Sequence, residues 1–197
     1  MNKIAVGMVS LGCPKNEIDG EHILHDLAED PRFDLAEEQE ADVLIVHTCA
    51  FIQAAREEAI GAILDACGRK EEGTLKAVVV TGCLAQRYQQ ELADEIPEVD
   101  VILGIGAHQQ IADAIVSALG GETVLSIGQK EQLRLSHPRL LTTPPHYAYL
   151  KIAEGCDNYC SYCAIPYIRG RFRSRPMDEI LKEAELLFRQ GVKELIV

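Results

Sequence analysis

Long hydrophobic runs and tryptophan are both absent from this 197-residue sequence. No apolar stretch approaches the ~20 residues that a membrane-spanning helix needs, so the sequence predicts no transmembrane segment. We also expect no secretory leader. The apolar stretch Ile4–Gly12 is short, only Lys3 precedes it as a basic residue, and a polar segment follows Cys13.

Basic residues are scarce in the first two thirds of the chain. Residues 1–128 hold 8 Lys and Arg against 23 Asp and Glu, a net charge of −15, whereas residues 129–197 hold 11 against 8, a net charge of +3. Because phosphate contacts dominate the affinity for nucleic acids, the acidic region is a poor binder of DNA. It suits a basic protein partner better, although a solvated acidic surface would give the same composition.

Seven cysteines are present, and their spacing does not indicate a disulfide framework. Six of them stand in patterns typical of metal ligands, and disulfides are rare in the reducing cytoplasm, where we expect this protein to reside.

Cys156, Cys160 and Cys163 form a C-x3-C-x2-C run. Thiolates are the usual ligands of iron–sulfur clusters, and three of them leave one iron of a four-iron cluster open for another ligand. Half of a zinc site, or three buried thiols, is the alternative.

Apolar runs and helical patterns alternate through residues 1–128, which predicts a parallel sheet covered by helices on both faces. We expect an α/β fold with a flavodoxin-like, doubly wound parallel sheet. The predicted strands are Ile4–Ser10, Val43–His47, Ala77–Thr81, Val99–Leu103 and Thr123–Ile127. The predicted helices are Glu17–Glu29, Gln53–Lys70, Ala85–Ile96 and Ala107–Leu119.

Three further cysteines each follow a predicted strand. Cys13 follows the first, Cys49 the second and Cys83 the third, and each is preceded by glycine or threonine. The carboxyl ends of parallel strands share one edge of a sheet, where such folds bind ligands. We therefore expect a second three-thiol metal site, with three unrelated buried cysteines as the alternative. Cys67 falls inside a predicted helix and is expected to be a small core residue instead.

Two other sequence features could indicate a binding site, but the evidence for each is weaker. Gly104 and Gly106 follow a strand, but the third glycine of a dinucleotide-binding motif is missing, so we expect only a tight turn there. His22 and His25 stand three apart on a predicted helix and could hold a metal. With no third ligand apparent, a solvated helix face is the favoured interpretation.

The segment 129–145 carries three prolines and no clear periodicity, so we expect a linker between a domain at 1–128 and a second one beginning at 146. Residues 146–197 predict a strand over His146–Ala153, the cysteine loop, a helix over Met177–Gln190 and a strand over Val192–Val197. This is the start of a (β/α) barrel.

Four arginines alternate with other residues along the chain: Arg169, Arg171, Arg173 and Arg175. We therefore expect their side chains on one face of an extended strand, where they would either contact an anion or form a solvated basic edge.

The motifs together resemble those of the radical S-adenosylmethionine (SAM) methylthiotransferases, over essentially all 197 residues. The segments that carry the resemblance are S-L-G-C-P-K-N, T-G-C-L-A-Q-R-Y, H-Y-A-Y-L-K-I-A-E-G-C and C-A-I-P-Y-I-R-G-R-F-R-S-R-P. They are most similar to the branch that modifies an aspartate of a small-subunit ribosomal protein. The tRNA-modifying branch usually has G-C-Q-M-N where this chain has Pro14-Lys15-Asn16. One departure is His47, where the family often has asparagine.

The resemblance implies two [4Fe–4S] clusters. One, on Cys156, Cys160 and Cys163, would bind SAM and generate a 5′-deoxyadenosyl radical that abstracts hydrogen from the aspartate β-carbon. The auxiliary cluster, on Cys13, Cys49 and Cys83, would deliver the sulfur, and a second SAM the methyl group. The implied partners are the ribosomal protein substrate and an electron donor such as flavodoxin or ferredoxin.

Three alternatives stay open at this point. The chain could modify isopentenyladenosine in tRNA, or it could be a non-catalytic iron–sulfur module that only passes electrons. It could also be an inactive truncated product, because a barrel needs more strands than residues 146–197 supply. We expect the 197 residues alone to be inactive and the complete enzyme to be longer.

Overall fold

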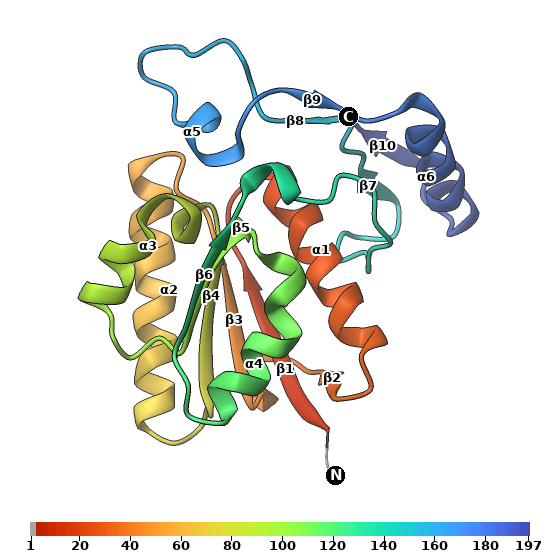
Figure 1. The fold of residues 1–197 in the computed structure, drawn as a ribbon. Helices are drawn as coiled ribbons and strands as arrows, with labels where there is room; N and C mark the ends of the chain where they lie inside the picture. The colour runs from red at the N-terminus through yellow and green to blue at the C-terminus, as the bar shows by residue number, and fades with distance from the viewer. Residues whose placement is uncertain (1–2) are drawn as a thin grey trace.

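Six parallel strands form the central sheet of the computed structural model, which describes residues 3–197 (Figure 1). The flavodoxin-like prediction is confirmed, with one strand more than expected. In sheet order the strands are β2 (Phe33–Leu35), β1 (Ile4–Ser10), β3 (Val43–Thr48), β4 (Ala77–Gly82), β5 (Val101–Gly106) and β6 (Val124–Gly128). The extra strand, β2, lies at the edge and pairs only with β1.

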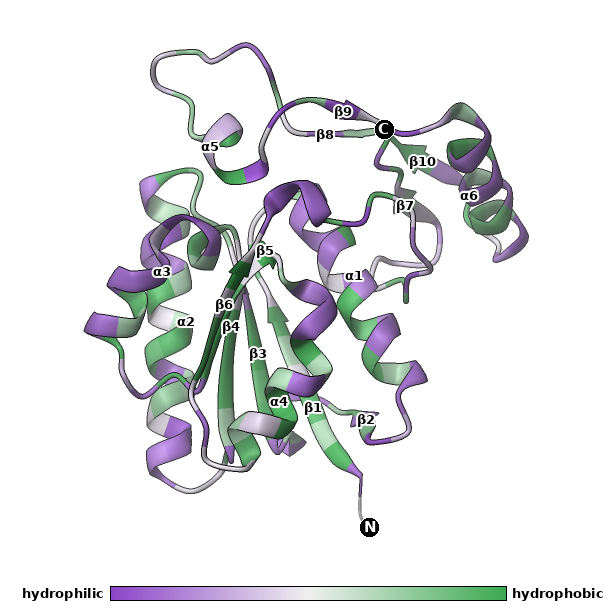
Figure 2. Cartoon of the chain, viewed as in Figure 1, coloured by the Kyte–Doolittle hydropathy of each residue, from purple (hydrophilic) through white to green (hydrophobic). Residues whose placement is uncertain are grey.

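Two helices cover each face of the sheet: α2 (Gln53–Glu71) and α3 (Cys83–Glu95) on one, α1 (Pro14–Glu29) and α4 (Ile111–Leu119) on the other. Successive residues of the central strands alternate between these two cores, as the pleat of a strand requires. Leu44 and Val46 of β3 face α2, whereas Val43 and Ile45 face α1. Figure 2 shows the result as mostly hydrophobic central strands between helices that carry both hydrophobic and hydrophilic residues. Among the helices of residues 3–197, none is both long and apolar enough to cross a membrane.

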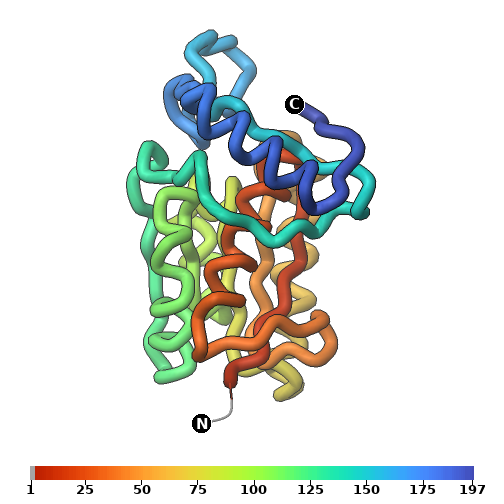
Figure 3. The backbone as a smooth tube through the Cα atoms, turned by 90° about the vertical axis from the view of Figure 1, so that its right-hand side faces the viewer, coloured from red at the N-terminus to blue at the C-terminus, as the bar shows by residue number. Residues whose placement is uncertain are grey.

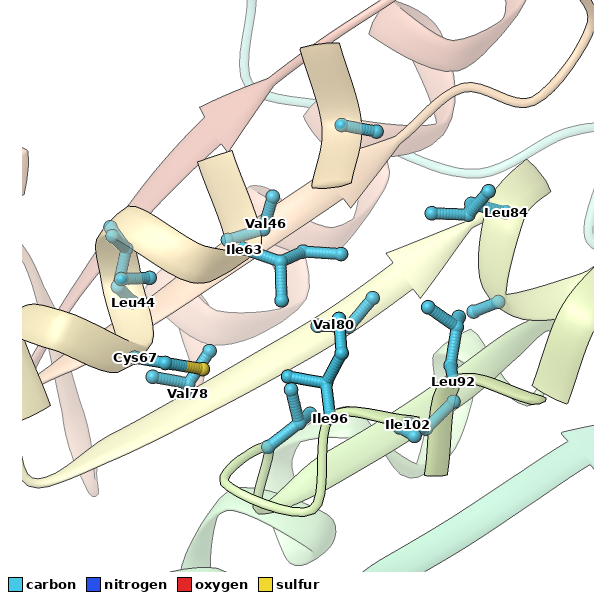
Figure 4. Close-up of a cluster of buried hydrophobic side chains, with 14 of the residues drawn as sticks. Leu44, Val46, Ile63, Cys67, Val78, Val80, Leu84, Leu92, Ile96 and Ile102 are labelled. Carbon is cyan, nitrogen blue, oxygen red and sulfur yellow. The ribbon is translucent and has the colours of Figure 1, made fainter. Parts of the chain in front are cut away.

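Cys67 lies within α2 on its core-facing side, as the sequence predicts. The residue is 5% exposed and packs in the same cluster as Ile63, Leu44 and Val78 (Figure 4). Burial raises the pKa of the Cys67 thiol to about 11, so this residue is a neutral hydrophobic side chain at physiological pH.

Gly104 and Gly106 lie at the end of β5, and the chain turns there as predicted, because the amide of Ala107 donates to the carbonyl oxygen of Gly104 at 2.9 Å. Glycine is needed at both positions because the neighbouring backbone leaves no space for a side chain. A Cβ atom on Gly106 would lie 2.3 Å from the carbonyl oxygen of Gln129, and one on Gly104 would lie 2.5 Å from that of Ile127. The two glycines therefore allow the chain after β6 to run close beside β5.

Residues 147–197 lie across the carboxyl ends of the sheet strands (Figure 1). Strand β7 (Tyr147–Tyr149) pairs in parallel with β10 (Glu194–Ile196), and α6 (Met177–Arg189) packs on them, as expected for the first unit of a (β/α) barrel. A short antiparallel pair, β8 (Ala153–Glu154) and β9 (Arg173–Ser174), and the helix α5 (Ile165–Arg169) complete this part.

The expected arginine strand is wrong. Arg169 ends α5, which begins beside Pro166, and Gly170 then turns the chain with a φ of +81°. Arg169 and Arg175 are buried, whereas Arg171 is exposed, so the alternating arginines do not share one face. Pro166 and Gly170 are the local signals for this break, because proline favours the first turn of a helix and glycine favours a left-handed turn after it.

The segment 129–145 is packed against α1 along much of its length, and Figure 3 shows it crossing that helix. The Arg139 guanidinium lies 2.6 Å from the Glu21 carboxylate, and both side chains are at least 95% buried. The amide of Thr142 donates to the same carboxylate at 2.7 Å. These contacts fix the direction in which the chain enters β7. The domain boundaries at 128 and 146 stay a prediction.

Candidate metal centres

The first cysteine triad lies at the carboxyl edge of three adjacent strands, β1, β3 and β4. Cys13 directly precedes α1, Cys49 directly follows β3, and Cys83 is the first residue of α3. Thr48 and Gly82 are paired in register, which places Cys49 and Cys83 side by side at the ends of their strands. Cys49 and Cys83 are buried and Cys13 is exposed, so the triad opens toward solvent on the side of Cys13.

Glycine before two of these cysteines permits the strand ends to approach one another. A Cβ atom on Gly12 would lie 2.6 Å from Cβ and 3.0 Å from Sγ of Cys49, and one on Gly82 would lie 2.5 Å from the carbonyl oxygen of Thr48. Both glycines have positive φ, +107° and +98°. No larger residue fits at either position without moving a cysteine or its neighbour.

Gly12→Ala is expected to lower the free energy of unfolding by roughly 3 kcal/mol, because it adds a steric clash with Cys49 to the cost of an unfavourable φ. Gly73→Ala is the matched control. Gly73 has φ +79°, and a Cβ atom there would meet nothing within 4 Å. Backbone strain alone should then cost about 1 kcal/mol. Urea unfolding of both variants, free of bound metal, measures the difference, and equal losses would contradict the close approach of Gly12 to Cys49.

The Asn16 side chain contacts the chain at the ends of all three strands, β1, β3 and β4. This fully buried side chain donates from Nδ2 to the carbonyl oxygens of Leu11 at 2.7 Å and Thr48 at 3.2 Å. Its Oδ1 accepts a hydrogen bond from Arg169 at 3.2 Å and lies 3.8 Å from Sγ of Cys83. Asn16 thereby holds the turn that carries Cys13 against the turn that carries Cys49.

The second triad occupies the loop between β8 and α5. The amide of Cys156 donates to the carbonyl oxygen of Gly170 at 3.1 Å, and the amide of Cys163 donates to that of Cys160 at 3.0 Å. Gly155 permits this path, because it has φ +74° and a Cβ atom on it would lie 2.1 Å from the carbonyl oxygen of Arg171. The loop is thus closed at both ends while Cys160 remains exposed.

Four buried charges lie between the two triads and balance one another. Asp19 and Glu154 are fully buried, and Lys151 and Arg169 are no more than 5% exposed. Nη1 of Arg169 lies 2.6 Å from Asp19 and 3.0 Å from Glu154. Lys151 forms ion pairs with the same two carboxylates. One partner comes from α1, and the others come from residues 151–169, so these ion pairs fasten the second part of the chain to the first.

The pKa values of these groups follow from the pairing. Burial alone would raise the pKa of the Asp19 carboxyl, but the adjacent Lys151 and Arg169 cations outweigh it and hold the pKa well below its usual range. The pKa of Glu154 is lowered for the same reason. Burial opposes the charge on Arg169 too, yet Asp19, Cys83 and Glu154 raise its pKa well above the usual value. All three side chains are therefore charged at physiological pH.

Arg169 also contacts the first triad directly. Its Nη2 donates to Sγ of Cys83 at 3.4 Å, although Arg169 itself follows the second triad in the chain. Burial raises the pKa of the Cys83 thiol to about 11, and the guanidinium opposes that effect. Sequence reasoning missed this role, as it missed those of Asp19, Lys151 and Glu154. The only local signal was the position of Arg169 directly before Gly170.

At position 47 this chain has histidine where the family often has asparagine. The imidazole of His47 lies in the core, in β3, two residues before Cys49. The ring is fully buried, and neither nitrogen has a hydrogen-bond partner within residues 3–197. It lies 5.7 Å, centroid to centroid, from the ring of His108 in a T-shaped arrangement. Burial lowers the pKa of His108 to about 4, so the His108 imidazole is neutral in the folded protein at physiological pH.

Acid is expected to destabilise the fold through His108. The unfolded chain binds a proton on this residue below pH 6.5, whereas the folded chain does so only below about pH 4. Its contribution to stability is therefore complete above pH 6.5 and is lost as the pH falls through that window. His108→Gln should remove up to roughly 3 kcal/mol of the acid-induced loss. Urea unfolding of metal-free protein at a series of pH values tests this, and parallel pH profiles for the two proteins would contradict it.

Both triads fit an iron–sulfur cluster in their donor set and surroundings. Each offers three soft thiols from turns that glycine makes narrow, and Arg169 supplies the first with an N–H donor to sulfur. A cleft of about 540 Å³ lies between the two parts of the chain, lined by Cys13 and Lys15 on one side and by Tyr149–Ala153 on the other. That the six cysteines are ligands stays a prediction from sequence and position.

Two protein-family descriptions match the chain. The one described as "Uncharacterized protein family UPF0004" covers residues 5–104, which hold the first triad, and the one described as "Radical SAM superfamily" covers residues 150–197, which hold the second.

Curated relatives match nearly the whole chain. The ribosomal protein uS12 methylthiotransferase RimO of Pelotomaculum thermopropionicum is 51% identical over 195 residues, covering 98% of this chain and 44% of that protein. The protein of the same name from Trichlorobacter lovleyi is 48% identical over 197 residues, covering 99% and 44%. That from Geotalea uraniireducens is 47% identical over 203 residues, covering 98% and 44%. The chain therefore spans less than half the length of these relatives.

Proposed function

Because the chain belongs to the UPF0004 family through residues 5–104 and continues into a radical SAM domain, we propose that it forms the N-terminal part of a radical SAM methylthiotransferase. Its substrate is the β-carbon of an aspartate in a small-subunit ribosomal protein. The names of its curated relatives, which it matches at 47–51% identity, support this substrate class. The excess of acidic residues in 1–128 supports a basic protein partner.

The observation that carries the proposal is the position of Arg169. It follows the second triad and donates a hydrogen bond to Cys83 of the first, within one buried set of charges. A protein that held two unrelated metal sites would have no need to link them through a buried ion-pair network. The link suits a reaction in which a radical formed at one triad acts next to a sulfur donor at the other.

Cys156, Cys160 and Cys163 would hold the cluster that binds SAM, and Cys13, Cys49 and Cys83 would hold the auxiliary cluster. When bound, these groups supply the one-electron and sulfur-transfer chemistry that amino-acid side chains cannot. The chain itself contributes position and charge. Asn16 and the two glycines fix the first triad, the Asp157 carboxylate accepts from the amide of Phe172 at 3.0 Å and steadies the second, and Arg169 favours negative charge on sulfur at Cys83.

The test uses full-length protein, reconstituted anaerobically with iron and sulfide and supplied with SAM and reduced flavodoxin or ferredoxin. Formation of 5′-deoxyadenosine together with a methylthio group on the ribosomal protein, detected by mass spectrometry, is the expected result. A methylthio group on tRNA adenosine instead would assign the other branch. Cluster reduction without any cleavage of SAM would show an electron-transfer module, and the proposal would fall.

A further inference from the structure

A group of histidines brings α1 together with the segment 129–145. His22, His25 and Asp26 belong to α1, and His137 comes from the segment 129–145 that crosses it. One ligand atom each from His25, Asp26 and His137 can be chosen so that all lie within 4.8 Å of one another. The expectation of a solvated helix face is wrong for His22, which is buried, whereas His25 stays partly exposed; the His137 ring packs against both.

His22 is oriented as a metal ligand would be. Its side chain is 91% buried, and its Nδ1 lies 3.1 Å from the carbonyl oxygen of Pro138. A carbonyl can only accept, so Nδ1 carries the hydrogen and Nε2 keeps a free lone pair. That Nε2 is buried and finds no hydrogen-bond partner in the described part of the chain. A backbone carbonyl that fixes the tautomer in this way is the usual support of a metal-binding imidazole.

His22, Asp26 and His137 line a small cavity of about 20 Å³. The ring of His137 lies 5.6 Å from that of His22 and 5.8 Å from that of His25, centroid to centroid. Nδ1 of His25 lies 3.8 Å from Oδ1 of Asp26 and is likewise buried without a hydrogen-bond partner within residues 3–197.

We propose that this group is a binding site for a first-row transition-metal cation, zinc in particular, with His25, Asp26 and His137 as ligands; His22 stands beside them, outside the set whose ligand atoms lie within 4.8 Å of one another. Imidazole and carboxylate donors suit zinc, which accepts four ligands in a tetrahedral arrangement. The site contains no thiol, so it is chemically distinct from both cysteine triads. Its metal would tie α1 to the segment that leads into the second triad.

A simple ion pair explains less of this geometry. Asp26 bonds His137, and Nη1 of Arg134 lies 3.9 Å from Oδ2 of Asp26 and 3.4 Å from Nε2 of His137. That arrangement leaves two buried imidazole nitrogens unsatisfied, at a cost of about 1–3 kcal/mol each. The Arg134 side chain is 45% exposed, so it can turn into solvent when a cation enters. A metal held by His25, Asp26 and His137 gives the His25 ring the partner that it lacks.

The experiment uses full-length protein whose cysteine triads already hold their clusters, so that thiols do not capture the probe. After equilibrium dialysis against zinc, elemental analysis should find one zinc per chain in addition to the iron. His137→Ala should weaken zinc binding by about 100-fold or more, and Asp26→Asn, which keeps the side-chain shape, should weaken it too. His146→Ala is the matched control, because His146 lies in the same region of the chain but is exposed and packs edge-to-face against Tyr147.

Cobalt supplies a second measurement that does not depend on affinity. Bound at this site, Co²⁺ should show ligand-field absorption without the intense sulfur-to-cobalt charge transfer that thiolate ligands produce, and His137→Ala should abolish it. Equal zinc content in His137→Ala and His146→Ala, or a cobalt spectrum with thiolate charge transfer alone, would overturn the site. Neither result bears on methylthio transfer, which the SAM assay tests separately.

Discussion

Arg169→Ala is expected to lower the free energy of unfolding by about 3–5 kcal/mol. The substitution leaves two fully buried carboxylates, Asp19 and Glu154, with Lys151 as their one buried cation among the described residues and the half-exposed Lys15 at 3.6 Å from Glu154. It also removes the hydrogen bond to Asn16 and the one to Cys83. Urea unfolding of the metal-free protein, followed by far-UV circular dichroism, measures the loss.

Arg171→Ala is the control, only two residues away. Arg171 pairs with Asp157 at 3.3 Å, but its side chain is 76% exposed, and solvent screening leaves surface pairs of this kind little effect on stability. A second variant separates charge from shape. Adding Asp19→Asn to Arg169→Met removes one charge of each sign, so it should recover part of the stability that Arg169→Met loses. Similar losses for Arg169→Ala and Arg171→Ala would show that the buried network contributes little.

The same arginine is expected to affect the auxiliary cluster. Hydrogen bonds to sulfur and nearby charge set the reduction potentials of iron–sulfur clusters. Removing the guanidinium beside Cys83 disfavours the added electron, so the midpoint potential of that cluster should fall in Arg169→Met. The potential of the cluster on Cys156, Cys160 and Cys163 should change less, because none of these thiols accepts a hydrogen bond from Arg169 within residues 3–197.

The sheet could be predicted because buried parallel strands are continuous apolar runs. Strands β3, β4 and β5 are buried at every position, and their sequences carry no polar alternation that would confuse them with surface strands. Strand β2 was missed for the opposite reason. Phe33-Asp34-Leu35 is three residues long with a charged residue at its centre, and only Phe33 is buried. Its pairing with β1 is decided by tertiary structure.

The positions of the six cysteines followed from the strand ends, but their surroundings did not. Arg169 meets Asp19 across 150 residues of sequence, and His137 meets Asp26 across 111. The periodicity of hydrophobic residues reflects only the local sequence, so it could not predict either of these long-range contacts. A buried arginine also contradicts the composition rule that places charged residues at the surface, unless its partner is known.

The strongest test of the ligand assignment compares two cysteines that are chemically alike. Cys67 and Cys83 are 5% and 7% exposed, and burial raises the pKa of each to about 11. Thiol accessibility and acidity therefore do not distinguish them. Position does, because Cys83 lies at the end of β4 beside Cys49, whereas Cys67 lies within α2.

After anaerobic reconstitution, Cys83→Ala is expected to lose the iron and sulfide of one whole cluster, while Cys67→Ala keeps the content of the unsubstituted protein. Removing Cys67 should instead cost about 1 kcal/mol of stability, because it leaves a small cavity between α2 and the sheet. Cys163→Ala should lose the other cluster, so Cys83→Ala with Cys163→Ala should retain almost no iron. If Cys67→Ala and Cys83→Ala lost iron equally, strand-end position would not define the ligands, and the site at the edge of β1, β3 and β4 would have to be abandoned.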